Sequence, residues 1–373
     1  MKFAINGKFT AQRITGVQRT AYELTRALQA RELPADELEV VVPQDAAGAS
    51  LSLKRKRMCA WFKGNLWEQI ALPLATTHQT LISLCNTGPL FKSNQIVMLH
   101  DMAVYDVPYA FSKKFRLWYK LKFSILHRQA RVILTVSAFS KARICHHLGI
   151  DEARVAVIPN GADHLDRVAS DPAILPRLGL TKDLYCVIVG SLDSRKNLQR
   201  VLDAVPQLDQ FRHIKFVVVG AANTRVFGSN QVEQHQSDQV VWAGFVTDGE
   251  LKALYGDASC LVFPSLYEGF GLPPLEAMYC GCPVIVSNEA SLPEVCGDAA
   301  MYCDATSVDD IAAKISLMLG DEELQQRYRE MGLRHALQFR WDRAASKLLR
   351  VLYGEAYAKA PQLAERPAAG QFR

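Results

Sequence analysis

Seven residues separate two glutamates in the segment YEGFGLPPLEAMYCGCPVIVS. Glu268 follows the apolar run CLVFP, which is typical of a buried strand, and Pro273 and Pro274 are tolerated in the first turn of a helix. The free backbone N–H groups at such a helix start bind phosphate well. Glu276, one turn further along, can accept hydrogen bonds from a ribose diol, and Glu268 can accept them from sugar hydroxyls. The whole string predicts a binding site rather than two solvated glutamates.

Two neighbouring cations follow another strand-like run, in VIVGSLDSRKNLQRVLDAV. The strand is expected to end at Gly190, and the turn after it carries Arg195 and Lys196 into a helix. An arginine can make two parallel hydrogen bonds to a phosphate, and a lysine supplies a compact positive charge, so the pair suits a diphosphate. The segment by itself is also compatible with a charged helix start that faces solvent.

Polar residues also follow the strand-like runs of the N-terminal half. Gly16, in NGKFTAQRITGVQRTAYEL, precedes a helix whose first turn offers free N–H groups. The segment lacks the GxGxxG fingerprint, which counts against a dinucleotide-dependent dehydrogenase. A lone histidine at a strand end is more often structural than functional. The other candidates that follow strand-like runs are Asn86, Thr87, His100, Asp101 and Ser137.

Short runs in which the residues facing both sides of a strand are apolar alternate with amphipathic segments along the chain. This pattern indicates parallel sheets covered on both faces. We therefore predict an α/β fold of two Rossmann-like, doubly wound parallel-sheet domains that face a central cleft. The domains are expected at 1–165 and 166–345, followed by a helix over 346–360 that crosses back to the first domain and a flexible tail over 361–373. Strands are expected in KFAI, LEVVVP, TLISL, QIVML, RVILTVS, VAVIP, LYCVIVG, IKFVVVG, VVWAGF, ASCLVFP, CPVIVS and AAMYC.

The string from Glu268 to Glu276 closely resembles the Glu-(seven residues)-Glu motif of glycosyltransferase family 4, whose members are retaining enzymes of the GT-B fold and include glycogen-synthase-like and mannosyltransferase-like enzymes. The resemblance covers nearly the whole chain. It implies that Glu268 contacts the donor sugar, that Glu276 contacts the nucleotide ribose, and that Lys196 with Arg195 holds the donor diphosphate. Many members carry arginine directly after the strand-ending glycine. This chain has Ser191 there, so Lys196 is the better supported cation.

The resemblance implies roles for the other candidates as well. His100, Lys196 and Glu268 are the expected catalytic residues, and Asn86, Asp101 and Ser137 are expected on the acceptor side. Asn160 and Gly161, which end VIPNG, are expected to shape the junction between the domains. The expected donor-binding residues are Gly16, Arg195, Lys196, Gly244, Phe245, Glu268, Gly269, Phe270, Gly271, Leu272 and Glu276.

The sequence places no nucleophilic residue in the site. Retention of the anomeric configuration then fits a mechanism in which the diphosphate departs from the same face that the acceptor attacks, and the resemblance implies this mechanism. In the family, helix N-termini and basic side chains neutralise the diphosphate. The chain has no D-x-D cluster in a strand context, so we predict no metal and no other cofactor besides the nucleotide-sugar co-substrate. Its nine cysteines form no C-x-x-C pair, and it has no apolar run near the ~20 residues that span a bilayer, which predicts a cytoplasmic protein.

The N-terminal half is strongly basic. Through Asn160 the chain has 22 Lys or Arg against 11 Asp or Glu, whereas the remainder has 21 against 27. Two stretches, LSLKRKRMCAWFKGNLW and FSKKFRLWYKLKFSILHRQAR, mix cations with aromatic residues, which fits a surface resting on anionic lipid. A solvated basic face is the alternative, and nucleic acid is not an expected partner because no recognised module accompanies the charge. The cations are Lys54, Arg55, Lys56, Arg57, Lys63, Lys113, Lys114, Arg116, Lys120, Lys122 and Arg128.

These features predict a retaining glycosyltransferase that moves a hexose from a nucleotide-diphosphate sugar to a hydroxyl of a lipid-linked saccharide in bacterial lipopolysaccharide or exopolysaccharide synthesis. The opening NGKF…TGVQR resembles bacterial family members, often mannosyltransferases, which favours GDP-mannose. We expect the protein to associate peripherally with the inner membrane. A GT-B nucleotide-sugar epimerase, a phosphorylase-like enzyme and a non-catalytic sugar- or lipid-binding module remain alternatives.

Overall fold

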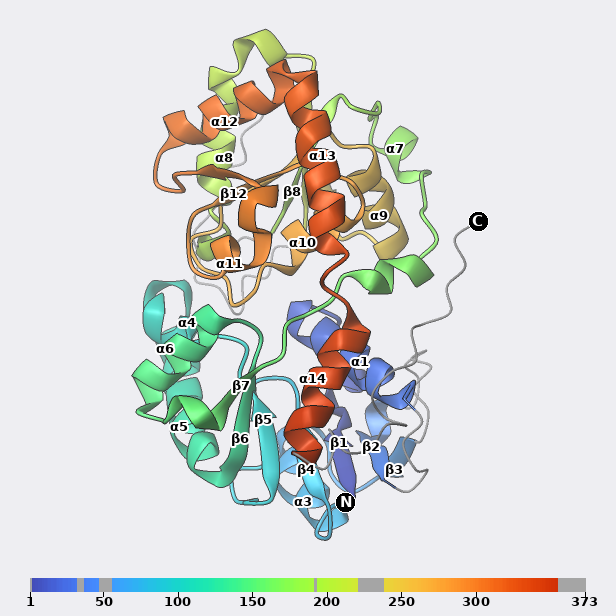
Figure 1. The fold of residues 1–373 in the computed structure, drawn as a ribbon, viewed down its shortest axis with the longest axis vertical. Coiled ribbons are helices and arrows are strands. Elements are labelled where there is room, and N and C mark those ends of the chain that lie inside the picture. The colour runs from blue at the N-terminus through green and yellow to red at the C-terminus, as the bar shows by residue number, and fades with distance from the viewer. Residues whose placement is uncertain (1, 32–36, 47–55, 191–192, 221–237, 355–373) are drawn as a thin grey trace.

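The computed structural model describes residues 2–31, 37–46, 56–190, 193–220 and 238–354. Two parallel β-sheets flanked by helices form the two halves of the molecule, the first half below and the second above in Figure 1. This arrangement confirms the predicted α/β class with two doubly wound halves. The domain boundary at 165/166 remains a prediction, and the predicted tail lies outside the described residues.

The first sheet has seven parallel strands in the order β3-β2-β1-β4-β5-β6-β7. Neighbouring residues of β1 pack into different core clusters: Phe3 and Ile5 join one, and Ala4 joins another. Both sheet faces are therefore buried, which is why its inner strands contain consecutive apolar residues. The strands are β1 Phe3–Asn6, β2 Leu38–Pro43, β3 Lys56–Cys59, β4 Thr80–Ser83, β5 Gln95–Met98, β6 Ala130–Thr135 and β7 Val155–Val157.

The second sheet has six parallel strands in the order β10-β9-β8-β11-β12-β13. Tyr185 and Val187 of β8 face one core cluster, whereas Cys186 and Ile188 face another, so this sheet is also buried on both faces. The strands are β8 Tyr185–Val189, β9 Lys215–Val219, β10 Val240–Gly244, β11 Cys260–Phe263, β12 Val284–Ser287 and β13 Met301–Cys303.

In each sheet the strand order reverses beside the first strand. β1 pairs with both β2 and β4, and β8 pairs with both β9 and β11. Ligands of doubly wound sheets bind outside the carboxyl ends of the strands at such a reversal. The segments that follow these strands are therefore the ones that can meet a ligand, and they contain the predicted residues Gly16, Asn86, Lys196 and Glu268.

The last helix returns to the first half, where it packs along α1 (Figure 1). The crossing helix that was expected over 346–360 corresponds to α14, which begins earlier, at Trp341, and is separated from α13 by residues 337–340. The helices are α1 Gly16–Gln29, α2 Gly64–Leu66, α3 Leu72–Ala75, α4 Ala103–Asp106, α5 Lys113–Gln129, α6 Ala138–Leu148, α7 Ile174–Arg177, α8 Leu198–Ala204, α9 Asp248–Gly256, α10 Leu272–Tyr279, α11 Leu292–Cys296, α12 Val308–Gly320, α13 Glu322–Ala336 and α14 Trp341–Tyr353.

A strand is present at every predicted apolar run, but β3 was not predicted. It lies at the edge of the first sheet and has the sequence KRMC. Arg57 in this strand forms a hydrogen-bonded ion pair with Glu39 of β2, at 2.7 Å. Arg57 and Met58 of this edge strand are exposed, so the strand lacks the consecutive apolar residues of the inner strands.

Candidate active site

Lys196 and Glu268 form an ion pair at the carboxyl edge of the second sheet. Lys196 ends a short 3₁₀ turn after β8, and Glu268 lies in the segment after β11. Lys196 Nζ lies 2.6 Å from Glu268 Oε1, and Ser265 Oγ donates a hydrogen bond to the same oxygen at 2.6 Å. The ammonium also lies 4.9 Å from the centre of the Phe263 ring. These contacts hold a fixed cation and a fixed carboxylate side by side.

Arg195 is engaged by the aspartate two residues before it. Its Nε lies 3.1 and 2.8 Å from the two carboxylate oxygens of buried Asp193, and its backbone N–H donates to Oδ1 at 3.0 Å. Burial acts to lower the pKa of the guanidinium, but the hydrogen bonds to Asp193 outweigh it and the pKa is raised. The guanidinium also lies 4.9 Å from the Phe111 ring of the first half. Arg195 is therefore held in place by Asp193, and Ser191 lies outside the described residues.

His100 follows β5 and is buried as a neutral imidazole. Its Nε2 lies 2.8 Å from the carbonyl oxygen of Leu84, so the tautomer with the proton on Nε2 fits this contact. Its backbone N–H donates to Asn86 Oδ1 at 2.7 Å, so the predicted acceptor-side Asn86 supports the His100 backbone. Burial lowers the pKa of His100, against the raising effects of Leu84 and Asp101. The Nδ1 lone pair can then accept a hydrogen bond from a hydroxyl.

The two halves touch at Gly269. A Cβ on this residue would lie 2.6 Å from the carbonyl oxygen of His100 and 3.0 Å from Asp101 Cβ, so a larger residue could not approach as closely. The Gly269 carbonyl oxygen accepts hydrogen bonds from Ser137 Oγ at 2.7 Å and from Ser140 Oγ at 3.1 Å. The junction thus brings a predicted donor-side residue against residues predicted on the acceptor side.

Two further contacts across the junction were not predicted. The Glu294 carboxylate, in α11, accepts hydrogen bonds from the backbone N–H groups of Ala138 and Phe139 at 2.7 and 2.9 Å, and so caps the start of α6. Tyr267 OH donates to Asp106 Oδ2 at 2.8 Å. The paired residues lie 156, 155 and 161 positions apart in the chain, so no local sequence pattern could have indicated them.

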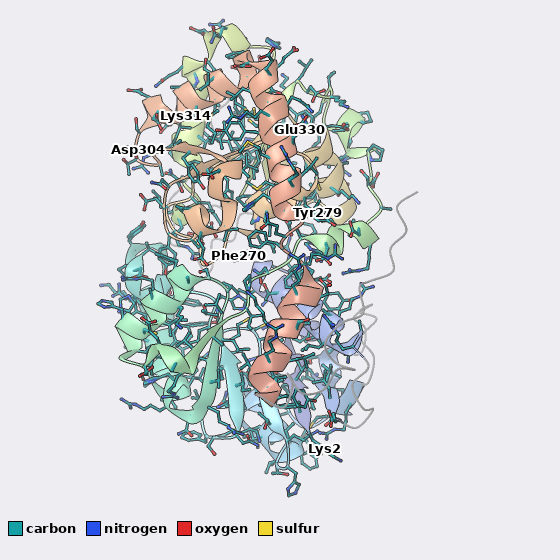
Figure 2. All side chains as sticks on the ribbon, viewed as in Figure 1. Lys2, Phe270, Tyr279, Asp304, Lys314 and Glu330 are labelled. Carbon is teal, nitrogen blue, oxygen red and sulfur yellow. The ribbon has the colours of Figure 1, made fainter. Side chains whose placement is uncertain are left out.

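The predicted nucleotide-binding segment forms the start of α10. Gly271 precedes this helix with a φ of +103°, a left-handed conformation that favours glycine. Leu272 is its first residue, and the prolines occupy its first turn as expected. Phe270 lies where the two halves meet (Figure 2), with its ring 6.0 Å from that of Phe339. Glu276 lies further along α10 and contacts His164, with 3.1 Å between Oε1 and Nε2.

The segment after β1 meets the segment after β10. Arg19, in the first turn of the helix that begins at Gly16, lies 2.6 Å from Asp248 Oδ2 at the start of α9. The guanidinium of Arg13 lies 4.1 Å from the centre of the Phe245 ring. Gly244, which ends β10, has a φ of +65°. The predicted glycine of the first half and the predicted Gly244 and Phe245 of the second half therefore belong to segments in contact.

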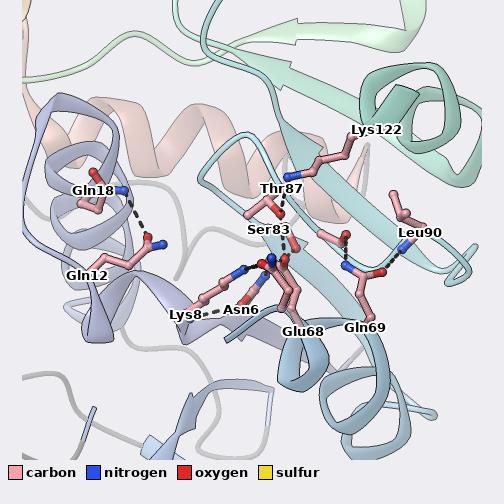
Figure 3. A network of polar contacts seen from close by, with 12 residues as sticks. Asn6, Lys8, Gln12, Gln18, Glu68, Gln69, Ser83, Thr87, Leu90 and Lys122 are labelled. Atoms are coloured by element: carbon pink, nitrogen blue, oxygen red, sulfur yellow. Dashed lines mark hydrogen bonds and ion pairs between the residues drawn. The ribbon is translucent and has the colours of Figure 1, made fainter. Parts of the chain in front are cut away.

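A buried polar network lies at the carboxyl ends of β1 and β4 (Figure 3). At its centre is Glu68, 1% exposed, which accepts hydrogen bonds from Asn6 Nδ2 at 3.0 Å, Lys8 Nζ at 2.9 Å and Thr87 Oγ1 at 2.7 Å. Lys122 of α5 extends it, with Nζ 3.5 Å from Thr87 Oγ1. Sequence reasoning missed Glu68 because one acid among polar and apolar neighbours has no distinguishing local pattern.

No group of three or more His, Cys, Asp or Glu placed to hold a metal ion occurs in the described part of the chain. Within the same residues, no helix combines the length and apolar character needed to cross a bilayer.

The chain matches two family models, "Glycosyltransferase Family 4" over residues 14–164 and "Glycosyl transferases group 1" over residues 172–335. It is 32% identical over 266 residues to O-antigen chain mannosyltransferase B of Escherichia coli, with 68% of each chain covered. It is 27% identical over 264 residues to O-antigen chain mannosyltransferase RfbU of Salmonella typhimurium, with 70% of this chain and 71% of the relative covered.

A solved structure with the same fold is that of Anabaena Alr3699/HepE in complex with UDP and glucose. The TM-score is 0.74 at 18% sequence identity, over 95% of this chain and 100% of that one. At this identity the similarity shows the fold alone.

Substitution Gly269→Ala is expected to push the two halves apart, because its Cβ would collide with the backbone of His100. The expected destabilisation is about 1–3 kcal/mol, as for other overpacked contacts. Small-angle X-ray scattering should show a larger radius of gyration and thermal unfolding a lower midpoint. Gly256→Ala is the control, since a Cβ there meets no atom within 4 Å. A Gly269→Ala protein with wild-type scattering and unfolding would contradict this account of the junction.

His100 is expected to titrate below about 6.5, the ordinary pKa of histidine. Because the unfolded chain then binds the proton more readily, this residue's contribution to stability is present above pH 6.5 and is lost as the pH falls through the lowered pKa. An NMR titration of the histidine ring signals, assigned with His100→Gln, measures the midpoint. A midpoint at or above 6.5 would refute the neutral buried imidazole.

Proposed function

This chain belongs to glycosyltransferase family 4, and on that premise we propose that it moves mannose from GDP-mannose to a hydroxyl of a lipid-linked saccharide in the synthesis of a bacterial surface polysaccharide. The chain is a glycosyltransferase. The choice of mannose and of O-antigen-type lipopolysaccharide rests on the two relatives that are named O-antigen chain mannosyltransferases.

The observation that carries the proposal is the Lys196–Glu268 pair, which lies beside the Gly269–His100 contact between the halves. A lysine at this edge, next to the start of α10, can take one oxygen of a diphosphate while the backbone N–H groups of Gly271 and Leu272 take others. The next two residues of α10 are prolines, which have no N–H. Glu268 has a second carboxylate oxygen for sugar hydroxyls, and the neutral His100 can accept a hydroxyl hydrogen bond through Nδ1. A donor sugar between these groups would be held from both halves.

In the proposed reaction, the bond between the anomeric carbon and the diphosphate oxygen breaks. A bond from that carbon to the acceptor oxygen forms on the same face, and the acceptor proton moves to the departing phosphate. Lys196 and the start of α10 stabilise the negative charge that develops on the diphosphate, and because they are already oriented, little reorganisation is needed. We propose that this charge stabilisation needs no metal ion.

An apolar and basic face of the first half supports docking on an anionic membrane. Its apolar side chains are well exposed: Trp61 is 64%, Phe91 is 89% and Leu117 is 72% exposed. They come from the segment before α2, from the loop before β5, and from α5. Contacts link the helical segment that follows α2 to this loop, and the loop to α5. Gln69 hydrogen-bonds to the backbone of Gly88 and Leu90, and Lys122 reaches Thr87. The other exposed apolar residues of this face are Phe62, Leu66, Ile70, Leu74, Trp118 and Leu121.

The charge around this face suits anionic lipid. Between Asp106 and Asp151 the sequence has no Asp or Glu, and Lys113, Lys114 and Arg128 of α5 are exposed. Each such cation near a membrane surface contributes about 1 kcal/mol to binding.

Two of the cations predicted for this surface are engaged within the protein. Lys122 is buried in the polar network, and Arg57 is paired with Glu39. Lys54 and Arg55 lie outside the described residues.

Release of GDP from GDP-mannose is expected only when a lipid-linked saccharide acceptor is present, because the acceptor oxygen completes the exchange. Lys196→Gln and Glu268→Gln are each expected to lower kcat about 10²–10³-fold, the usual cost of removing one preorganised group. Lys314→Gln, at a half-exposed position on α12 where the lysine pairs with Asp310, is the control and should keep wild-type turnover. UDP-, ADP- and dTDP-sugars in the same assay test the donor. GDP release without acceptor, or unchanged turnover in both active-site variants, would refute the proposal.

The protein is expected to co-sediment with phosphatidylglycerol vesicles at low salt and to dissociate at high salt, because salt screens the attraction between the cations and the lipid. Leu117→Asp should weaken binding, whereas Leu317→Asp, at an exposed position on α12 in the other half, should not. Binding to neutral phosphatidylcholine vesicles alone would argue against this surface.

A further inference from the structure

The chain passes between its two halves twice, and the two passages meet beside Glu276. The first follows β7, and the second is the short segment between α13 and α14. Ala162 N–H donates to Phe339 O at 3.1 Å, and Trp341 N–H donates to Asp163 Oδ1 at 2.8 Å. A Cβ on Gly161 would collide with the backbone nitrogen of Trp341, so the passages are packed backbone to backbone.

His164, in the first passage, links the second passage to Glu276. The indole N–H of Trp341 donates to His164 Nδ1 at 3.3 Å, and His164 Nε2 lies 3.1 Å from Glu276 Oε1. A nitrogen that accepts a hydrogen bond carries no proton, so the indole selects the tautomer with hydrogen on Nε2. This tautomer donates to the carboxylate. The chain of contacts is closed to solvent, since His164 and Trp341 are each 2% exposed and Glu276 is 8% exposed.

Oε1 of the Glu276 carboxylate is therefore hydrogen-bonded within the protein, whereas Oε2 is not. Within the described residues, His164 is the polar partner found for this carboxylate. Oε2 has no such partner in this part of the chain, and the atom is still accessible to solvent. A glutamate side chain has several freely rotating bonds, and a single fixed oxygen leaves the other pointing in a defined direction.

We propose that His164 is a positioning residue that orients Glu276 for the ribose hydroxyls of the donor nucleotide. Trp341 sets the tautomer of His164, and His164 holds Oε1, so that Oε2 is presented to the ribose. The orientation of a donor-binding carboxylate thereby depends on the place where the two halves are joined. This inference rests on the proposed nucleotide-sugar site.

The test compares GDP with 2′,3′-dideoxy-GDP by isothermal titration calorimetry. Wild-type protein should bind GDP at least 10-fold more tightly. His164→Ala should lose most of this preference by weakening GDP binding, with little effect on the dideoxy compound. His164→Gln, whose amide N–H can reach the same oxygen, should restore it. A purely structural role would instead weaken both nucleotides alike and would not be rescued selectively.

Tyr279→Phe is the matched control. Tyr279 lies on the same helix as Glu276, and the substitution removes its 2.7 Å hydrogen bond to Asp166 without touching Glu276. It should keep the full preference. If His164→Ala does not fold, Trp341→Phe removes the indole donor together with part of the ring and should reduce the preference through the tautomer. If folded His164→Ala keeps the full preference for GDP, this inference is overturned. If His164→Ala does not fold, the same result in Trp341→Phe overturns it. Wild-type protein that binds no nucleoside diphosphate would overturn the proposed donor site itself.

Discussion

The close approach of the Gly269 backbone to the carbonyl oxygen of His100 is the constraint on which the active-site arrangement depends. A parallel sheet directs the segments after its strands to a single edge, so each half offers its polar groups on one side only. The two edges must face each other before groups from both can meet one ligand. Glycine permits that approach, and the hydroxyls of Ser137 and Ser140 fix its geometry through hydrogen bonds to the Gly269 carbonyl. This contact fixes the position of His100 of the first half relative to Glu268, the residue before Gly269 in the second half.

Charge at this junction is paired in the protein itself. Lys196 is held by Glu268, and Arg195 by Asp193. Burial keeps His100 neutral. A buried cation without a partner is costly, so each pair makes its own burial tolerable and also fixes the direction of its side chains. Groups fixed in this way stabilise developing charge better than water, which must reorient to do so. In the proposed reaction the same pairing that stabilises the fold also prepares the diphosphate site.

Local pattern determined how much the sequence could predict. The inner strands were predictable because burial on both faces makes consecutive residues apolar. The placement of Lys196 and Glu268 at the carboxyl edge of the second sheet was predictable because each follows such a strand. Edge strand β3 was missed since it begins with two basic residues and has only two apolar ones. The role of His164 could not be predicted, because Glu276 and Trp341 lie 112 and 177 positions away and meet it only once the halves are joined.

A crystal structure of the protein with GDP-mannose would test the central claim, that the donor binds at the edge of the second sheet facing the first half. We expect the diphosphate at the start of α10 within hydrogen-bonding distance of Lys196 Nζ, the sugar between Glu268 and His100, and the ribose on Glu276. A nucleotide bound elsewhere, for example at the Glu68 network in the first half, would contradict the account.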